Sequence, residues 1–243
     1  MVREDFEKRV SEVNEYFEII KFLEYDKPKI SAYCITENLP KEIIFDANRI
    51  NILRSNAFLL LYNLVESTVF NSITSIFDAI NSNTHTPQLK YHNLIDEVKK
   101  YWINNYYQHD EKIKKETVVN TFFDLANHIF ENSITLVSNR LKYGGSIDAK
   151  IMEETARNLG VGLSHLKNGF DNNTHGEAFK QVKKHRNWLA HGDKSFVDIG
   201  KDYPYNQLNE WRKFIEEHLN KFIVSIEDYI SNERYKKNLD VED

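Results

Sequence analysis

Apolar residues recur every three or four positions along much of the chain, which is the spacing of amphipathic helices. In residues 3–25 the stripe consists of Phe6, Val10, Val13, Phe17, Ile20 and Leu23. Residues 41–81 form the longest periodic stretch, and between Phe58 and Phe70 apolar side chains occupy the other faces as well. We therefore expect a first amphipathic helix followed by a long central helix that is buried on most sides.

Further helices are predicted along the rest of the chain. Their ranges are 89–107, 115–141, 149–159, 174–191 and 205–231. Pro28 and Pro40 bound a connector at 26–40, and Ser146 or Asp148 is expected to cap the helix at 149–159. The chain contains only 8 Gly and 4 Pro, and no segment alternates convincingly between apolar and polar residues. The sequence therefore predicts an all-α fold.

We expect these helices to form a single all-α domain over residues 1–243. Residues 1–40 supply the N-terminal helix and the connector, residues 41–231 the helical core, and the charged residues 232–243 a frayed tail. A hydrophobic fraction of 41% with 28% charged residues is typical of an ordinary globular protein.

The net charge of -5 restricts the classes of partner. It argues against a broadly positive surface for non-specific nucleic-acid binding, but it leaves room for a local basic site. The single cysteine, Cys34, excludes an intrachain disulfide and fits a cytoplasmic protein. The most apolar run, Ala57–Val65, is interrupted by Asn63, so we expect no membrane span.

Candidate chemistry is concentrated near the end of the helix predicted at 174–191. Asn187 and His191 are four residues apart and therefore share one face of that helix. Arg186 lies about 100° further round, but its long side chain can reach the same space. One turn earlier the chain carries Lys180, Lys183 and Lys184. A phosphodiester at this place would meet a guanidinium, an amide and an imidazole, with ammonium groups nearby.

This set of groups suits RNA cleavage without a metal ion. In such a reaction the 2′-hydroxyl attacks the phosphorus, so a base, an acid and cations for the developing negative charge are needed. Histidine exchanges protons near neutral pH, and arginine binds phosphate oxygens at two points. The other histidines lack metal-ligand spacing such as His-Glu-x-x-His, and the glycines form no nucleotide-binding loop. We therefore expect neither a metal nor a cofactor.

The block Arg186-Asn187-x-x-Ala190-His191-Gly192 resembles the motif of the HEPN superfamily (higher eukaryotes and prokaryotes nucleotide-binding). That motif is an arginine, often followed by a polar residue, then four to six residues, and then a histidine. A longer pattern is similar to the MAE-type HEPN-like nucleases. It includes Asn48-Arg49-Ile50, Tyr62–Ser67 and Gly144–Asp148. The resemblance spans most of the chain.

This resemblance implies a HEPN-like helical bundle with additional helices that dimerises with its two motifs facing each other across a cleft. It also implies metal-independent RNA cleavage in a toxin–antitoxin or antiviral setting, with an antitoxin or defence-system protein as a further partner. Arg186 and His191 take the catalytic positions, and Asn187 takes the polar position beside the arginine. Some relatives carry a tyrosine, modified by a partner enzyme, where this chain has Asp193.

Several assignments stay open on the sequence alone. Glu66 lies in a very apolar stretch and needs a partner, for which Arg54, Arg49 and Arg186 are candidates. The resulting ion pair would be structural or would support the active site. The bulky aromatic residues are expected in the core or near a dimer seam, and not as platforms for bases. These are Trp188, Trp211 and Phe222.

Two other functions remain as alternatives. The first is a non-catalytic HEPN module that binds RNA or a nucleotide and acts as a scaffold or sensor. The second is a plain helical interaction domain, in which Lys180, Lys183 and Lys184 are only a solvated face and His191 is only an exposed helix end. Neither alternative gives the Arg186–His191 block a chemical task.

Overall fold

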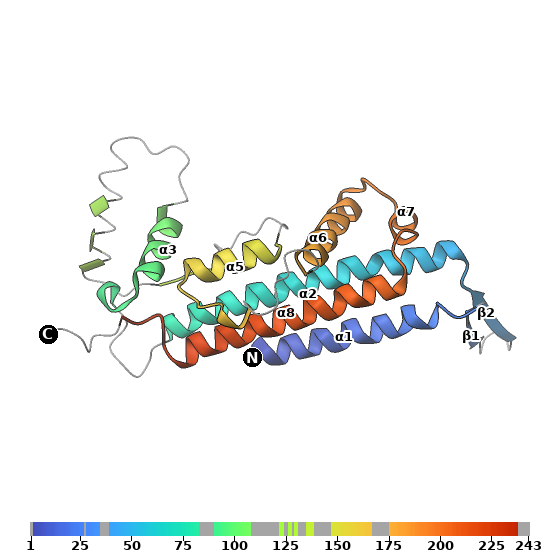
Figure 1. The fold of residues 1–243 in the computed structure, drawn as a ribbon, viewed down its shortest axis with the longest axis horizontal. Helices are drawn as coiled ribbons and strands as arrows, with labels where there is room; N and C mark the ends of the chain where they lie inside the picture. The colour runs from blue at the N-terminus through green and yellow to red at the C-terminus, as the bar shows by residue number, and fades with distance from the viewer. Residues whose placement is uncertain are drawn as a thin grey trace. The chain divides into compact units, whose positions relative to one another are not determined.

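The computed structural model describes residues 2–26, 28–34, 39–82, 90–107, 122–123, 126–127, 129–130, 135–138, 147–166 and 175–237. Figure 1 shows a fold of helices with one small hairpin. The chain divides into two compact units, Arg3–Ser67 with Phe170–Leu219 and Thr68–Gly169 with Asn220–Asp243. Two long helices, α2 (Ala47–Asn81) and α8 (Tyr205–Ser231), contribute one part to each unit. The predicted all-α fold with a long central helix is confirmed.

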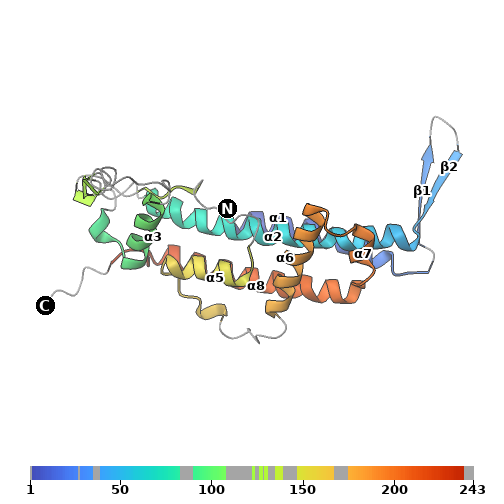
Figure 2. The ribbon, with the colours of Figure 1, turned by 90° about the horizontal axis from the view of Figure 1, so that it is seen from above.

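The first unit contains α1 (Val2–Phe22), α6 (His175–His191), α7 (Phe196–Gly200) and the first parts of α2 and α8. Helix α1 runs alongside α2 and α8 (Figure 1), whereas α6 crosses α2 and α8 in the view of Figure 2. The apolar stripe of α1 is buried at Phe6, Val13, Phe17 and Ile20. The sequence pattern therefore placed the correct face of this helix against the core.

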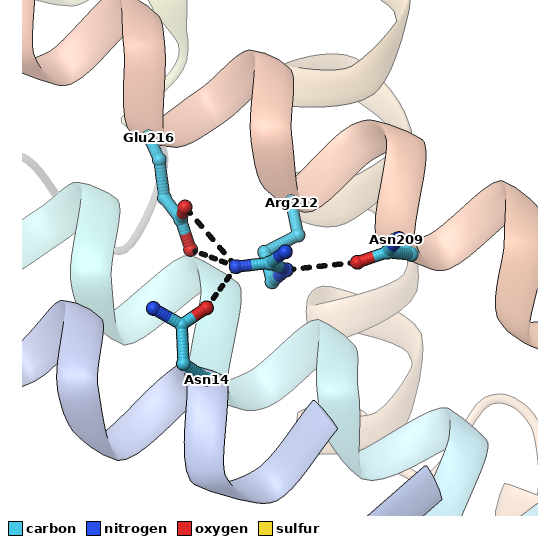
Figure 3. Close-up of polar contacts among 4 residues, drawn as sticks. All are labelled: Asn14, Asn209, Arg212 and Glu216. Atoms are coloured by element: carbon cyan, nitrogen blue, oxygen red, sulfur yellow. Dashed lines mark hydrogen bonds and ion pairs between the residues drawn. The ribbon is translucent and has the colours of Figure 1, made fainter. Parts of the chain in front are cut away.

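Polar contacts fix α1 to its two neighbours. The Tyr16 hydroxyl donates to the Leu53 carbonyl of α2 at 2.7 Å. Towards α8, the Arg212 guanidinium donates to Asn14, to Asn209 and to both carboxylate oxygens of Glu216 (Figure 3). Arg212 is mostly buried, so these acceptors replace the water that its charge loses on folding.

A β-hairpin precedes α2 and corrects the prediction for this region. Strands β1 (Lys29–Cys34) and β2 (Leu39–Ile44) pair antiparallel from Lys29↔Ile44 to Cys34↔Leu39. Helix α2 therefore begins at Ala47 and not at residue 41, and Asp46 caps its first turn by accepting from the Arg49 amide at 2.9 Å. Ile43 and Ile44 favour extended backbone, and a Lys29–Glu42 ion pair of 2.9 Å joins the strands.

The second unit contains α3 (Asp96–Tyr107), α5 (Ala149–Asn158), the short 3₁₀ turns η1 (Tyr91–Asn93) and η3 (Ser164–Leu166), and the remainder of α2 and α8. Asp148 caps α5 by accepting from the Ile151 amide at 3.0 Å, so it fills one of the two predicted capping positions. The buried Tyr229 hydroxyl donates to the Leu159 carbonyl at 2.5 Å and ties α8 to the end of α5.

The expected frayed tail does not begin at residue 232. Tyr235 is buried, its carbonyl accepts from the Ile95 amide, and the Lys237 amide donates to the Asn93 carbonyl. These backbone bonds hold the segment to the start of α3. Residues 238–243, most of the helix predicted at 115–141 and the Gly144–Ser146 segment lie outside the described residues.

Candidate active site

Helix α6 presents a buried face and an exposed face, and the candidate residues lie on or beside the exposed one. Its buried face consists of Ala178, Phe179, Val182, His185 and Leu189. The helix ends at Gly192, whose φ of +75° allows the Asp193 amide to bond back to the Trp188 carbonyl at 2.9 Å. His191 therefore lies in the last turn, and its side chain is exposed.

Two rows of side chains run along the outer part of α6 with a spacing of four residues. One row is Lys180, Lys184 and Trp188, and the other is Lys183, Asn187 and His191. Lys180, Lys184 and His191 are exposed, whereas the other three are half-buried. Because residues four apart are neighbours on a helix, Lys183 leads directly to Asn187 and His191, whereas Lys180 and Lys184 lead to Trp188.

Arg186 is directed towards α2 and not towards solvent. Its guanidinium carbon lies 4.4 Å from the centroid of the Tyr62 ring, and Tyr62 is buried. Its Nη1 donates to Oδ1 of Asn187 at 3.0 Å. A cation held over an aromatic face keeps its charge and loses conformational freedom, so Arg186 and Asn187 form a pre-positioned pair.

Arg186 and His191 do not share a face of one chain. Five residues of an α-helix span about 7.5 Å along the axis and turn by about 140°. Arg186 lies against Tyr62, whereas His191 stands at the exposed end of the helix. The contact that the structure shows within the motif is therefore the pair Arg186–Asn187.

The expected pairing of Glu66 with Arg54 or Arg49 is wrong. Arg54 donates to Glu24 at the end of α1, at 2.6 Å, and Arg49 lies 3.9 Å from Asp46. Glu66 is half-buried and forms no ion pair with any residue that the structure describes. It follows Tyr62 by one helical turn, so it lies on the face of α2 over which Arg186 is held.

His185 is a core residue that the sequence analysis did not single out. Its ring stacks on Phe58 with centroids 4.6 Å apart, and Tyr203 and Trp188 meet it edge-on. Its Nδ1 lies 2.7 Å from the Gln181 carbonyl, which fits a neutral ring that donates from Nδ1. Burial lowers the pKa of His185, and the nearby lysine charges lower it further. Its position on the buried stripe of α6 is the sequence feature that could have identified His185 as a core residue.

Trp188 lies between this core and the solvent. It is half-buried, whereas the other two bulky aromatics named from the sequence, Trp211 and Phe222, are buried as expected. The ammonium groups of Lys184 and Lys194 lie 4.5 and 4.2 Å from the centroid of the indole ring. Lys194 follows the end of the helix and was not among the predicted RNA-binding residues.

Comparison with known families identifies the family of this chain. The sequence model of the HEPN_MAE_28990-like HEPN family matches residues 2–235, which covers both units. The chain belongs to this HEPN family. Comparison with curated proteins and with solved structures gave no match.

Two further observations describe the HEPN chain. Within the described ranges, no group of three histidine, cysteine, aspartate or glutamate residues is arranged to hold a metal ion. In the same part of the HEPN chain, no helix is both long enough and apolar enough to cross a bilayer. The candidate residues of α6 offer arginine, amide, imidazole and ammonium groups.

Proposed function

We propose that this HEPN protein is a metal-independent RNA endonuclease. Cleavage proceeds by transesterification, in which the 2′-hydroxyl attacks the adjacent phosphorus and the 5′-oxygen leaves. The observation that carries the proposal is the Arg186–Asn187 pair at the end of α6, one turn before an exposed histidine, in a chain of the HEPN family. His191 transfers the protons, and Arg186 stabilises the charge that develops on the phosphorane.

The geometry of α6 supports a site made from two copies of the chain. A single chain contributes one histidine and one arginine, and these point in different directions around the helix. Transesterification needs both a proton acceptor and a proton donor. A two-fold axis beside the end of α6 would bring the His191 and the Arg186–Asn187 pair of both copies to one cleft, with one histidine as acceptor and the other as donor. The working species in this proposal is a homodimer that uses α6 and the adjoining part of α2.

The lysines of α6 supply the local positive charge that RNA binding requires. The chain as a whole carries a net charge of -5, so attraction of RNA depends on a confined basic surface. Lys180 and Lys184 are exposed, and Lys183 is half-buried one turn before Asn187. The row of Lys183 leads to His191 and the row of Lys180 and Lys184 leads to Trp188, so the two rows orient a bound strand along the helix towards the motif.

A second candidate function is a non-catalytic HEPN module that binds RNA or a nucleotide. The observation in its favour is that Arg186 already has a structural position over Tyr62 and beside Asn187. In this reading the arginine stabilises the crossing of α6 over α2, and His191 has no chemical task. The two candidates make opposite predictions about cleavage, so one assay separates them.

The setting that we propose for the nuclease is a toxin–antitoxin or antiviral system, with an antitoxin or defence-system protein as the binding partner, and the family resemblance supports it. Asp193 stands where some relatives have a modified tyrosine, so silencing through that tyrosine does not apply to this chain. A partner would have to act by covering the end of α6.

Incubation of the purified protein with mixed RNA in EDTA tests the proposal. Cleavage should persist after chelation and leave 2′,3′-cyclic phosphate or 3′-phosphate ends, because the 2′-hydroxyl is the nucleophile. DNA of the same sequence lacks that nucleophile and should remain intact. Loss of cleavage on chelation, or 3′-hydroxyl products, would refute the mechanism, and a complete absence of cleavage would favour the non-catalytic module.

A further inference from the structure

Lys184 and Lys194 share one aromatic ring and pair with no carboxylate among the described residues. Several lysines form ion pairs with carboxylates, namely Lys29, Lys99, Lys201 and Lys236. Lys184 and Lys194 instead lie over the ring of Trp188, at 4.5 and 4.2 Å, and neither forms an ion pair with a described residue. Asp198, four residues after Lys194, is bonded to Ser195 and Lys201.

This cluster lies beside the candidate catalytic histidine. Trp188 precedes His191 by three residues, a spacing that makes two helical side chains neighbours. Lys194 follows His191 by three residues, just beyond the turn at Gly192. The buried His185 meets the indole edge-on at 86°, so the core fixes the orientation of the ring. The cluster is therefore a held aromatic ring with two exposed cations at the end of α6.

The two cations are held weakly and repel each other. A cation–π contact at an exposed position is worth only about 0.5–1 kcal/mol. Both ammonium groups lie close to one ring centroid, so they are within roughly 9 Å of each other and their charges interact unfavourably. A phosphate offers each of them a stronger, charge-assisted hydrogen bond. When the lysines turn to phosphates, a face of the indole is left for an apolar or aromatic group.

We infer that Trp188, Lys184 and Lys194 form a subsite for a nucleotide of single-stranded RNA next to the scissile phosphate. The base stacks on the indole, and the lysines bind the phosphates on either side of it. Single-stranded RNA fits because its bases are free to stack on a protein side chain, whereas those of a duplex are paired. An acidic peptide would satisfy the lysines but would leave the ring without a partner. The inference rests on the proposed nuclease function and adds Trp188 and Lys194 to its binding residues.

Equilibrium binding in a His191→Ala background tests the subsite without cleavage of the probe. The probe is a labelled single-stranded RNA of mixed sequence, followed by fluorescence anisotropy at several salt concentrations. Trp188→Leu should raise the Kd roughly 5- to 150-fold, because stacking of one base is worth about 1–3 kcal/mol. Trp188→Phe keeps an aromatic face and should retain most of the affinity.

The two lysines are tested together, because their side chains are exposed and their replacement does not disturb the core. The double variant Lys184→Gln/Lys194→Gln should flatten the log–log dependence of affinity on salt by about 1.4, since each phosphate contact contributes about 0.7 for single strands. The matched control is Lys150→Gln/Lys213→Gln, which removes the same charge from exposed positions away from the Trp188 ring.

Three results would overturn the subsite. The first is an unchanged Kd and salt slope in both the Trp188→Leu and the double-lysine variants, or an RNA that does not bind the background protein at all. The second is an equal effect of Trp188→Leu on a duplex of the same sequence, or an effect on binding of a polyglutamate peptide in place of RNA. The third is a loss of dimer mass in Trp188→Leu by sedimentation, which would make Trp188 an interface residue.

The proposed nuclease function is tested separately, by measuring RNA cleavage by the wild-type chain in EDTA. Cleavage together with unchanged binding in the variants refutes the subsite and leaves the nuclease. Absence of cleavage together with Trp188-dependent binding of single strands refutes the nuclease and leaves an RNA-binding surface. If Trp188→Leu does not fold, the double-lysine variant still decides the question.

Discussion

Helix α6 carries two histidines in opposite environments. His185 is buried between Phe58 and Tyr203, and burial lowers its pKa. His191 lies six residues later, exposed in the last turn before Gly192. One side chain is an aromatic core residue that happens to be titratable, whereas the other has the access to solvent that proton transfer to a substrate requires.

This difference shows that the chemical role of a residue depends on its position on the helix more than on its type or its nearness to a motif. His185 is adjacent to Arg186 in sequence, yet it belongs to the buried stripe. Trp188 lies at the border between the two regions, with its edge on His185 and its ring beneath two lysines. Substitutions in the two regions should therefore separate stability from activity.

The largest expected effect is on the exposed side of this comparison. His191→Ala should lower the rate of RNA cleavage by about 10²–10⁴, which is the usual contribution of one general acid–base group. The free energy of unfolding of the His191→Ala variant should change by less than about 0.5 kcal/mol, because the side chain is exposed. His92→Ala, at another exposed histidine, is the matched control and should leave cleavage unchanged. Equal cleavage by the two variants would remove His191 from the site.

The opposite pattern is expected on the buried side. His185→Ala should lower the free energy of unfolding by about 2–4 kcal/mol, because it leaves a cavity beneath Phe58 and Tyr203. His185→Phe keeps the stacked ring, so its free energy of unfolding should fall by less. Urea unfolding followed by circular dichroism measures both variants. A fully stable His185→Ala protein that cleaves no RNA would contradict the assignment of His185 to the core.

A smaller effect tests the packing that brings Tyr203 to His185. Gly200 ends α7 against α2, where a Cβ atom would overlap the backbone of Asn51. Gly200→Ala should therefore destabilise the protein by about 1–3 kcal/mol, the usual cost of overpacking. Gly162→Ala is the control, because a Cβ there meets no atom within 4 Å. Similar melting temperatures for the two variants would show that α7 can move away from α2 at little cost.

The smallest effect is the pH dependence that His185 contributes. Its pKa is lowered in the folded state, so the unfolded chain binds a proton more readily than the folded chain. The contribution to stability is fully present above the ordinary histidine pKa of about 6.5 and is lost as the pH falls below it. Urea unfolding at several pH values should show this loss in the wild type and not in His185→Phe. The same pH dependence in both proteins would exclude His185 as its source.

The helices were predictable where periodicity and stop residues agree. The last helix has the predicted ends, Tyr205 and Ser231, and α6 begins one residue later than predicted and ends at His191 before Gly192. The β-hairpin was not predictable in the same way. Ile43 and Ile44 are adjacent, so they extend the apolar stripe of α2 as readily as they form a strand, and most side chains of the ribbon are exposed and show no alternation.

The contacts of the candidate site residues were not predictable from the sequence. The block from Arg186 to His191 can be read from the sequence, but the ring that holds Arg186 belongs to α2, at Tyr62. That pairing depends on where α6 crosses α2, which local sequence does not determine. The same reason explains the wrong partner for Glu66 and the omission of Lys194, which reaches Trp188 from beyond the end of the helix.

The most direct test of the composite site is cleavage by mixed dimers. A fixed amount of wild-type chain is equilibrated with increasing amounts of His191→Ala chain, and the rate of RNA cleavage in EDTA is measured. If the reaction needs the His191 of both copies as proton acceptor and donor, only wild-type pairs cleave, and random pairing lowers the rate to about one tenth at a roughly ninefold excess of the variant. If one His191 is enough, the rate stays at its starting value at every ratio, and that result would contradict the account.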